Sequence, residues 1–188
     1  VNDYADRNFD PHVERTKDRP LASGVIRPNE ALALAAVLML CAFGLVLFLN
    51  AFAIKLLFVV AAIAVIYPFV KRVFPLPQLW LGLAFGCGIL MAYAALWNAL
   101  PLVAWLLLLA TLFWALAYDT VYAMVDRDDD LKIGIKSSAI LFGQYDVVAV
   151  LGAHVLFLGT MTAIGWWQLR GAAYYAGLFV ASLLVLYQ

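Results

Sequence analysis

Two distant segments of the chain repeat one spacing of polar and acidic residues. The first runs from Asn2 to Asp10 and the second from Tyr122 to Asp130, and each reads polar-x-x-x-Asp-x-x-x-Asp. On an α-helix, residues four positions apart lie on one face, with about 6 Å of rise between them. Each segment is therefore expected to present two carboxylates in a row, which are Asp6 and Asp10 in the first and Asp126 and Asp130 in the second.

Carboxylates stacked in this way repel one another, and a divalent cation between them removes that cost. Ligands that are all oxygen favour Mg²⁺ or Ca²⁺, and Mg²⁺ commonly takes one or two protein carboxylates and completes its shell with water and substrate phosphates. The four aspartates are thus predicted to hold Mg²⁺ ions that clamp a diphosphate. Basic residues expected to meet the phosphate oxygens are Arg7, Lys71, Arg72, Lys132 and Lys136. Asp128 and Asp129 break the spacing and are expected to be outer or solvated groups.

The composition indicates which elements position these residues. The chain is 66% apolar and 13% charged, against about 45–50% and about 25% in soluble domains. This excludes a soluble globular fold, a disordered chain and an electrostatic nucleic-acid binder. The pattern predicts one all-α membrane domain over residues 1–188, in which residues 1–10 end a further helix. The apolar runs, expected to be spanning helices, are 31–49, 52–70, 78–97, 102–123, 147–167 and 172–188.

The charges indicate an orientation. If the spans alternate, the segments 1–30, 71–77 and 124–146 lie on one side and carry ten of the twelve basic residues. The positive-inside rule makes that side cytoplasmic. All twelve acidic residues lie on or near it, and a shared chemical site explains that clustering most simply. Gly82, Gly86 and Gly88 are expected to let helices pack closely, with room for a substrate tail as the alternative. Both ends of the sequence are expected to be interior points of a longer protein.

The two segments resemble the signature motifs NxxxDxxxD and YxxxDxxxD of the UbiA superfamily of intramembrane aromatic prenyltransferases. The stretches closest to its 4-hydroxybenzoate polyprenyltransferase branch are 2–6, 15–16, 19–21, 67–69 and 118–137. The resemblance covers essentially the whole chain and implies a polytopic helical bundle. Members of the superfamily have nine transmembrane helices, and this chain matches the end of the second through most of the eighth.

The resemblance implies Mg²⁺-dependent transfer of a polyprenyl group from its diphosphate to the ring of 4-hydroxybenzoate, an early step of ubiquinone biosynthesis. It implies that Asn2 and Tyr122 lie near the diphosphate. Arg72 matches a basic loop residue that binds the diphosphate or the benzoate carboxylate. Asp126 or Asp119 orients the phenol or accepts the ring proton, and the sequence does not choose between them. The expected location is the bacterial cytoplasmic (inner) membrane, with the active site toward the cytoplasm; the mitochondrial inner membrane fits as well.

The acidic segments also allow other interpretations. Within the superfamily the acceptor can be homogentisate, dihydroxynaphthoate or haem. CDP-alcohol phosphotransferases also bind metals through aspartate clusters, but their single motif contains Asp-Gly and Ala-Arg, which this sequence lacks in that arrangement. A cation transporter places its acidic residues near the membrane midplane, whereas here they lie at helix ends beside basic residues. The expected partners are the polyprenyl diphosphate, the aromatic acceptor and the lipid bilayer; no nucleic acid is expected and no protein partner is evident.

Overall fold

A computed structural model describes residues 2–187, and every regular element within them is a helix. This confirms the all-α prediction. In chain order the elements are α1 (Asn2–Asp6), η1 (Asp10–His12), α2 (Pro28–Val46), α3 (Ala51–Val70), α4 (Pro77–Trp97), α5 (Leu102–Ile133), α6 (Ser138–Phe142), η2 (Gly143–Tyr145), α7 (Asp146–Trp167) and α8 (Ala172–Tyr187).

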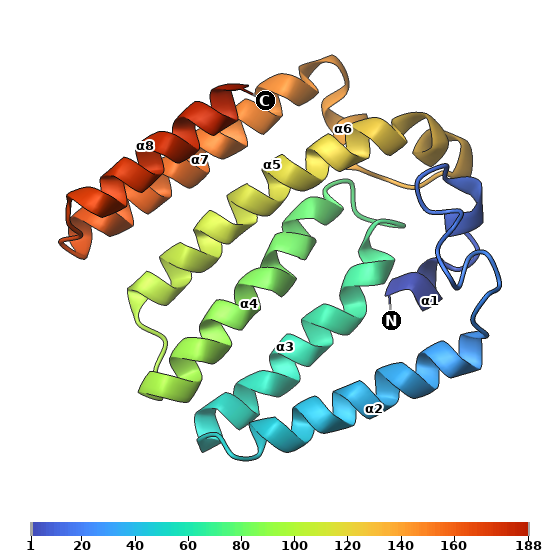
Figure 1. Cartoon of the computed structure of the whole chain (residues 1–188), viewed down its shortest axis with the longest axis horizontal. Helices are drawn as coiled ribbons and strands as arrows, with labels where there is room; N and C mark the ends of the chain where they lie inside the picture. The colour runs from blue at the N-terminus through green and yellow to red at the C-terminus, as the bar shows by residue number, and fades with distance from the viewer. Residues whose placement is uncertain (1, 188) are drawn as a thin grey trace.

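The long helices lie side by side and alternate in direction (Figure 1). α3 packs on α4, α4 on α5, α5 on α7 and α7 on α8, so α5 is central. α2 makes only sparse contacts, with α1 and with α3, and buries none of its own residues in the described chain. Five segments are long and apolar enough to cross a membrane: α2, α3, α4, α5 and the stretch from Ser138 to Trp167. The large apolar side chains that they expose suit contact with lipid rather than water.

Two glycines allow α4 and α5 to approach closely. A Cβ added to Gly82 would lie 2.8 Å from the Cα of Leu112, and one added to Gly86 would lie 3.0 Å from the Cγ of Leu108. Gly88, two residues after Gly86, has no such neighbour within 4 Å. Gly82 and Gly86 therefore have the packing role that the sequence predicted, and Gly88 does not.

Replacing Gly82 by alanine is expected to lower the thermal midpoint of the purified protein. The added methyl group meets backbone, and overpacking of this kind costs about 1–3 kcal/mol. Gly88→Ala is the matched control, because it brings the same gain in helix propensity of about 1 kcal/mol without the clash. Thermal unfolding in detergent would contradict the packing argument if both variants unfolded at the same temperature.

Helix α5 extends ten residues beyond the span predicted over 102–123. The prediction stopped where charged residues begin, but nothing between 124 and 133 breaks a helix. The helix ends at Gly134, which has φ 72° and donates its N–H to the carbonyl of Asp130, the left-handed cap that glycine adopts without steric cost. The extension keeps Tyr122, Asp126 and Asp130 on one continuous helix.

The first acidic segment differs from the predicted helix end over 1–10. α1 ends at Asp6, a turn follows, and Asp10 begins the 3₁₀ helix η1. The cause is Pro11, which disfavours helical backbone at Asp10 and clashes with the carbonyl four residues before it. The prediction that Asn2, Asp6 and Asp10 share one helical face was therefore wrong for Asp10.

Candidate active site

One cavity of about 300 Å³ lies where the first acidic segment meets the ends of α3 and α5. In Figure 1 these ends gather on one side of the molecule, together with α6. The cavity brings together residues separated by more than 120 positions in the sequence. The predicted site residues that line it are Asn2, Asp6, Asp10, Lys71, Asp119, Tyr122, Asp126, Asp130 and Lys136.

Asp6 is the most deeply buried acidic residue of the site, with 1% of its surface exposed. Lys71, at the end of α3, donates a hydrogen bond of 2.7 Å from Nζ to the Asp6 Oδ2. The other carboxylate oxygen, Oδ1, is buried without any hydrogen-bond partner. A buried oxygen without a partner is costly, so this atom is a natural ligand for a cation in the cavity.

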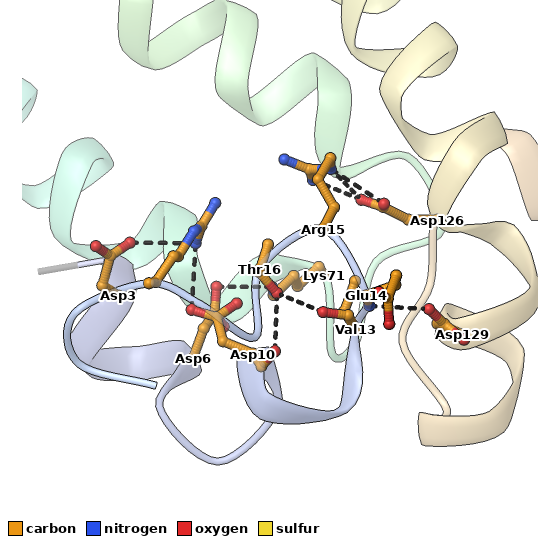
Figure 2. A network of polar contacts seen from close by, with 11 residues as sticks. Asp3, Asp6, Asp10, Val13, Glu14, Arg15, Thr16, Lys71, Asp126 and Asp129 are labelled. Carbon is orange, nitrogen blue, oxygen red and sulfur yellow. Dashed lines mark hydrogen bonds and ion pairs between the residues drawn. The ribbon is translucent and has the colours of Figure 1, made fainter. Parts of the chain in front are cut away.

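Asp10 is 6% exposed and receives its partners from the loop that follows it. The Arg19 Nη1 donates to Asp10 Oδ2 at 3.2 Å and to Asp3 Oδ1 at 3.2 Å, while the Thr16 hydroxyl donates to the Asp10 carbonyl at 2.9 Å. Figure 2 shows Asp3, Asp6 and Asp10 side by side in this network. Burial raises the pKa of the Asp10 carboxyl and the nearby Asp6 adds to the rise, whereas Arg19 opposes it.

Asp126, on α5, is bonded directly to Arg15, and both residues line the cavity (Figure 2). The Arg15 Nε donates to both carboxylate oxygens at 3.1 Å, and Nη2 donates to Oδ2 at 2.5 Å. The guanidinium also lies 5.4 Å from the ring centroid of Tyr122, in the range of a cation–π contact. The hydrogen bond to Asp126 raises the pKa of Arg15 further above its ordinary value. Two N–H groups of the guanidinium thus donate to one carboxylate, and a guanidinium binds phosphate oxygens with the same forked geometry.

The three consecutive aspartates at the end of α5 are not equivalent. Asp130 is 8% exposed and lines the cavity, and no basic side chain in the described chain forms an ion pair with it. Asp129 lies outside the cavity, where it accepts hydrogen bonds from Lys132 Nζ at 3.0 Å and from the Glu14 backbone at 3.2 Å. The outer role predicted for Asp129 agrees with this position.

Some predicted phosphate contacts lie elsewhere. Arg7 does not line the cavity, and its Nη1 donates to the Tyr4 carbonyl at 2.7 Å. Lys132 points to Asp129 and does not line the cavity. Lys136 contributes to the cavity wall, but its ammonium donates to the Val73 carbonyl at 2.9 Å. Arg72 also lies outside the cavity lining, and its Nη2 donates to the Ala5 carbonyl at 2.7 Å.

The sequence predicted no site role for Arg15, Arg19 and Gln78, which also line the cavity. Arg15 and Arg19 follow the first acidic segment, and their four-residue separation was the available signal. Gln78, at the start of α4, is 3% exposed and accepts a hydrogen bond on Oε1 from the Ser138 backbone at 3.1 Å. Its signal was a lone amide in an otherwise apolar run.

The donor set fits a divalent ion that shares its shell with a phosphate ligand. Within residues 2–187, no three His, Cys, Asp or Glu side chains already converge as a closed metal site. Mg²⁺ does not require that, because it is commonly bound by one or two carboxylates plus substrate phosphates. The four aspartates of the two acidic segments face one cavity, and one of them, Asp6, carries an unpartnered buried oxygen. The residues therefore suit oxygen-only ligation of hard cations next to a basic anion site.

Comparison with known proteins identifies a family and relatives that match the whole chain. A model of the UbiA prenyltransferase family matches residues 1–188. The chain is 55% identical over 187 residues to the 4-hydroxybenzoate octaprenyltransferase of Thiobacillus denitrificans and 57% identical over 190 residues to that of Aeromonas salmonicida. These matches cover 100% of this chain but 64% and 65% of the relatives, so the chain spans just under two thirds of their length.

Two solved structures share the arrangement of helices. The apo UbiA homologue of Aeropyrum pernix K1 superposes with a TM-score of 0.88 at 31% identity, covering 98% of this chain and 70% of that one. A digeranylgeranylglyceryl phosphate synthase, at 23% identity and a TM-score of 0.69, covers 99% of this chain and 66% of that one and supports the fold alone. With its five membrane-length apolar segments, this is an integral membrane protein. The chain belongs to the UbiA prenyltransferase family.

Proposed function

We propose that the complete protein transfers a polyprenyl group from a polyprenyl diphosphate to the ring of 4-hydroxybenzoate in a Mg²⁺-dependent reaction, an early step of ubiquinone biosynthesis. The observation that carries the proposal is the meeting of both acidic segments and four basic residues around one cavity at one end of the long helices. The names of the two relatives support the choice of donor and acceptor.

The diphosphate head is proposed to bind between the acidic segments. Mg²⁺, held by Asp6, Asp10, Asp126 and Asp130, would neutralise the diphosphate and assist its departure as a Lewis acid. Arg15, Arg19 and Lys71 already line the cavity, and each can exchange a carboxylate oxygen for a phosphate oxygen with the same geometry. Asn2 and Tyr122 line the same wall and are proposed to contact the diphosphate or its first isoprene unit.

The chemistry is an electrophilic substitution on the acceptor ring. The bond between the allylic carbon and the diphosphate oxygen breaks, and the electron pair leaves with the diphosphate. The ring carbon ortho to the phenol bonds to the allylic carbon, and the proton on that ring carbon passes to a base. Tyr67, Tyr118 and Tyr122 line the cavity and offer aromatic faces to the developing positive charge.

The base is proposed to be Asp119 or Asp126. Asp119 lies seven residues before Asp126 on α5, which places it about 10 Å farther along the helix from the cytoplasmic end. Both line the cavity. Asp119 therefore lies deeper along α5 than the proposed diphosphate site, where the aromatic acceptor is proposed to bind.

A cavity that excludes bulk water protects the allylic cation from hydrolysis.

The proposed location is the bacterial cytoplasmic (inner) membrane, with the cavity toward the cytoplasm. The support is the positive-inside rule, because ten of the twelve basic residues belong to the segments at the cavity end. The acidic residues lie at helix ends beside basic groups, which disfavours transport of cations and suits capture of a diphosphate.

The test is a reconstituted assay with the full-length protein in detergent. We expect a prenylated 4-hydroxybenzoate by mass spectrometry with Mg²⁺, loss of product with excess EDTA, and recovery when Mg²⁺ is restored. A panel with homogentisate, dihydroxynaphthoate and haem as acceptors tests the specificity. Product from another acceptor in place of 4-hydroxybenzoate would overturn the acceptor assignment, and undiminished turnover in EDTA would overturn the metal assignment.

A further inference from the structure

Arg72 connects the end of α3 to the first acidic segment without entering the cavity. Its Nη2 donates a hydrogen bond of 2.7 Å to the Ala5 carbonyl. Its guanidinium carbon lies 5.1 Å from the ring centroid of Phe9 and 5.1 Å from that of Phe69. A planar guanidinium can contact two aromatic rings and donate from its edge at the same time.

The two residues that Arg72 contacts in the first acidic segment each directly precede one of its two aspartates. Ala5 directly precedes Asp6, and Phe9 directly precedes Asp10. The neighbouring Lys71 binds the Asp6 carboxylate itself. Arg72 therefore contacts the backbone or ring just before each carboxylate of the pair, whereas Lys71 contacts one of the carboxylates.

This contact matters because no helix spans the two aspartates. α1 ends at Asp6, and only turn hydrogen bonds follow, from the Phe9 N–H to the Asp6 carbonyl at 2.7 Å and from the His12 N–H to the Phe9 carbonyl at 2.9 Å. In α5, by contrast, a continuous ladder of hydrogen bonds fixes the separation of Asp126 and Asp130. The separation of Asp6 and Asp10 therefore depends on contacts from outside their own segment.

We propose that Arg72 is a positioning residue that holds Asp6 and Asp10 at the separation needed to share a divalent cation, and that it does not bind the substrate. The link to the cation rests on the proposed function, but the effect on the backbone of the first acidic segment does not. A cation at the C-terminal carbonyls of α1 is also favoured by the helix dipole. The planar side chain, not its charge alone, is what the position requires.

Amide hydrogen exchange in the substrate-free protein tests the backbone effect directly. Arg72→Met and Arg72→Lys are expected to accelerate exchange of the Phe9, His12 and Val13 amides by about tenfold, the factor for loss of about 1.4 kcal/mol of local stability. Lysine keeps the charge but has no planar face for the two rings. The matched control is Arg7→Lys. Arg7 directly follows α1, where it donates to the Tyr4 carbonyl at 2.7 Å and stacks on the Tyr4 ring, and its replacement is expected to leave these three amides unchanged.

A second readout separates positioning from substrate binding. In the prenyl-transfer assay, the Arg72 variants and Phe69→Leu are expected to raise the Mg²⁺ concentration for half-maximal rate more than the KM for the prenyl diphosphate. Phe69→Leu retains the arginine and removes one of its rings, so a substrate-binding arginine would not respond to it. Unchanged exchange in Arg72→Met, or equal acceleration in Arg7→Lys, overturns the inference. So does a rise confined to the KM for the diphosphate. Amide hydrogen exchange tests the positioning role of Arg72 even if 4-hydroxybenzoate proves not to be the acceptor.

Discussion

Replacing Asp6 or Asp126 by alanine is expected to lower the rate of prenyl transfer by about a thousandfold. Each substitution removes one carboxylate from a different acidic segment, and both side chains face the same cavity. A metal-bound diphosphate loses several kcal/mol of charge stabilisation when its metal is poorly held, and each 1.36 kcal/mol corresponds to a tenfold change in rate. The measurement is single-turnover product formation at saturating diphosphate and Mg²⁺.

The control for this prediction is Asp3→Asn. Asp3 belongs to the same helix as Asp6 and pairs with Arg19, but its side chain is 55% exposed and does not line the cavity. Its replacement is expected to change the rate by less than about threefold, as is usual for an exposed ion pair. If Asp6→Ala and Asp126→Ala turned over like the unmodified protein, the assignment of these carboxylates to the metal would be wrong.

The second acidic segment could be predicted well from sequence because it is a single uninterrupted helix. The four-residue spacing then fixes which side chains share a face, and Asp126 and Asp130 both line the cavity as that spacing requires. The apolar pattern located the membrane part of α5 but not its end. Hydropathy reports where lipid contact stops, whereas the helix continues to the glycine that terminates it.

The first acidic segment shows where the same argument fails. Its spacing is identical, but Pro11 ends helical geometry before Asp10. Asp10 still reaches the cavity because the following loop folds back, with Thr16 and Arg19 bonded to it. Contacts of this kind depend on the path of a loop, and no periodicity in the sequence encodes that path.

Adjacent basic residues also proved impossible to distinguish from sequence. Lys71 and Arg72 are neighbours at the end of α3, and successive residues on a helix point about 100° apart. One side chain therefore reaches the Asp6 carboxylate in the cavity, while the other reaches the Ala5 carbonyl outside it. Residue type predicted phosphate contact for both, and only the direction of each side chain separates them.

Arg15→Gln is expected to raise the KM for the prenyl diphosphate by about 10- to 100-fold with a smaller effect on kcat. Arg15 is the cavity residue with a complete guanidinium fork on Asp126, and the same fork fits a diphosphate oxygen pair. A hydrogen bond to a charged group contributes about 1.5–3 kcal/mol, which corresponds to this range of KM at about 1.4 kcal/mol for each factor of ten.

Lys17→Gln provides the comparison for Arg15→Gln, because both remove one positive charge from the same loop. Lys17 pairs with Glu14 outside the cavity, and its side chain is 44% exposed, so its loss changes only the long-range field, which salt screens. Steady-state kinetics at low and at physiological salt should therefore leave Lys17→Gln near the parent KM and Arg15→Gln far above it. Equal shifts in the two variants that vanish with added salt would mean that Arg15 attracts the diphosphate from a distance and makes no direct contact with it.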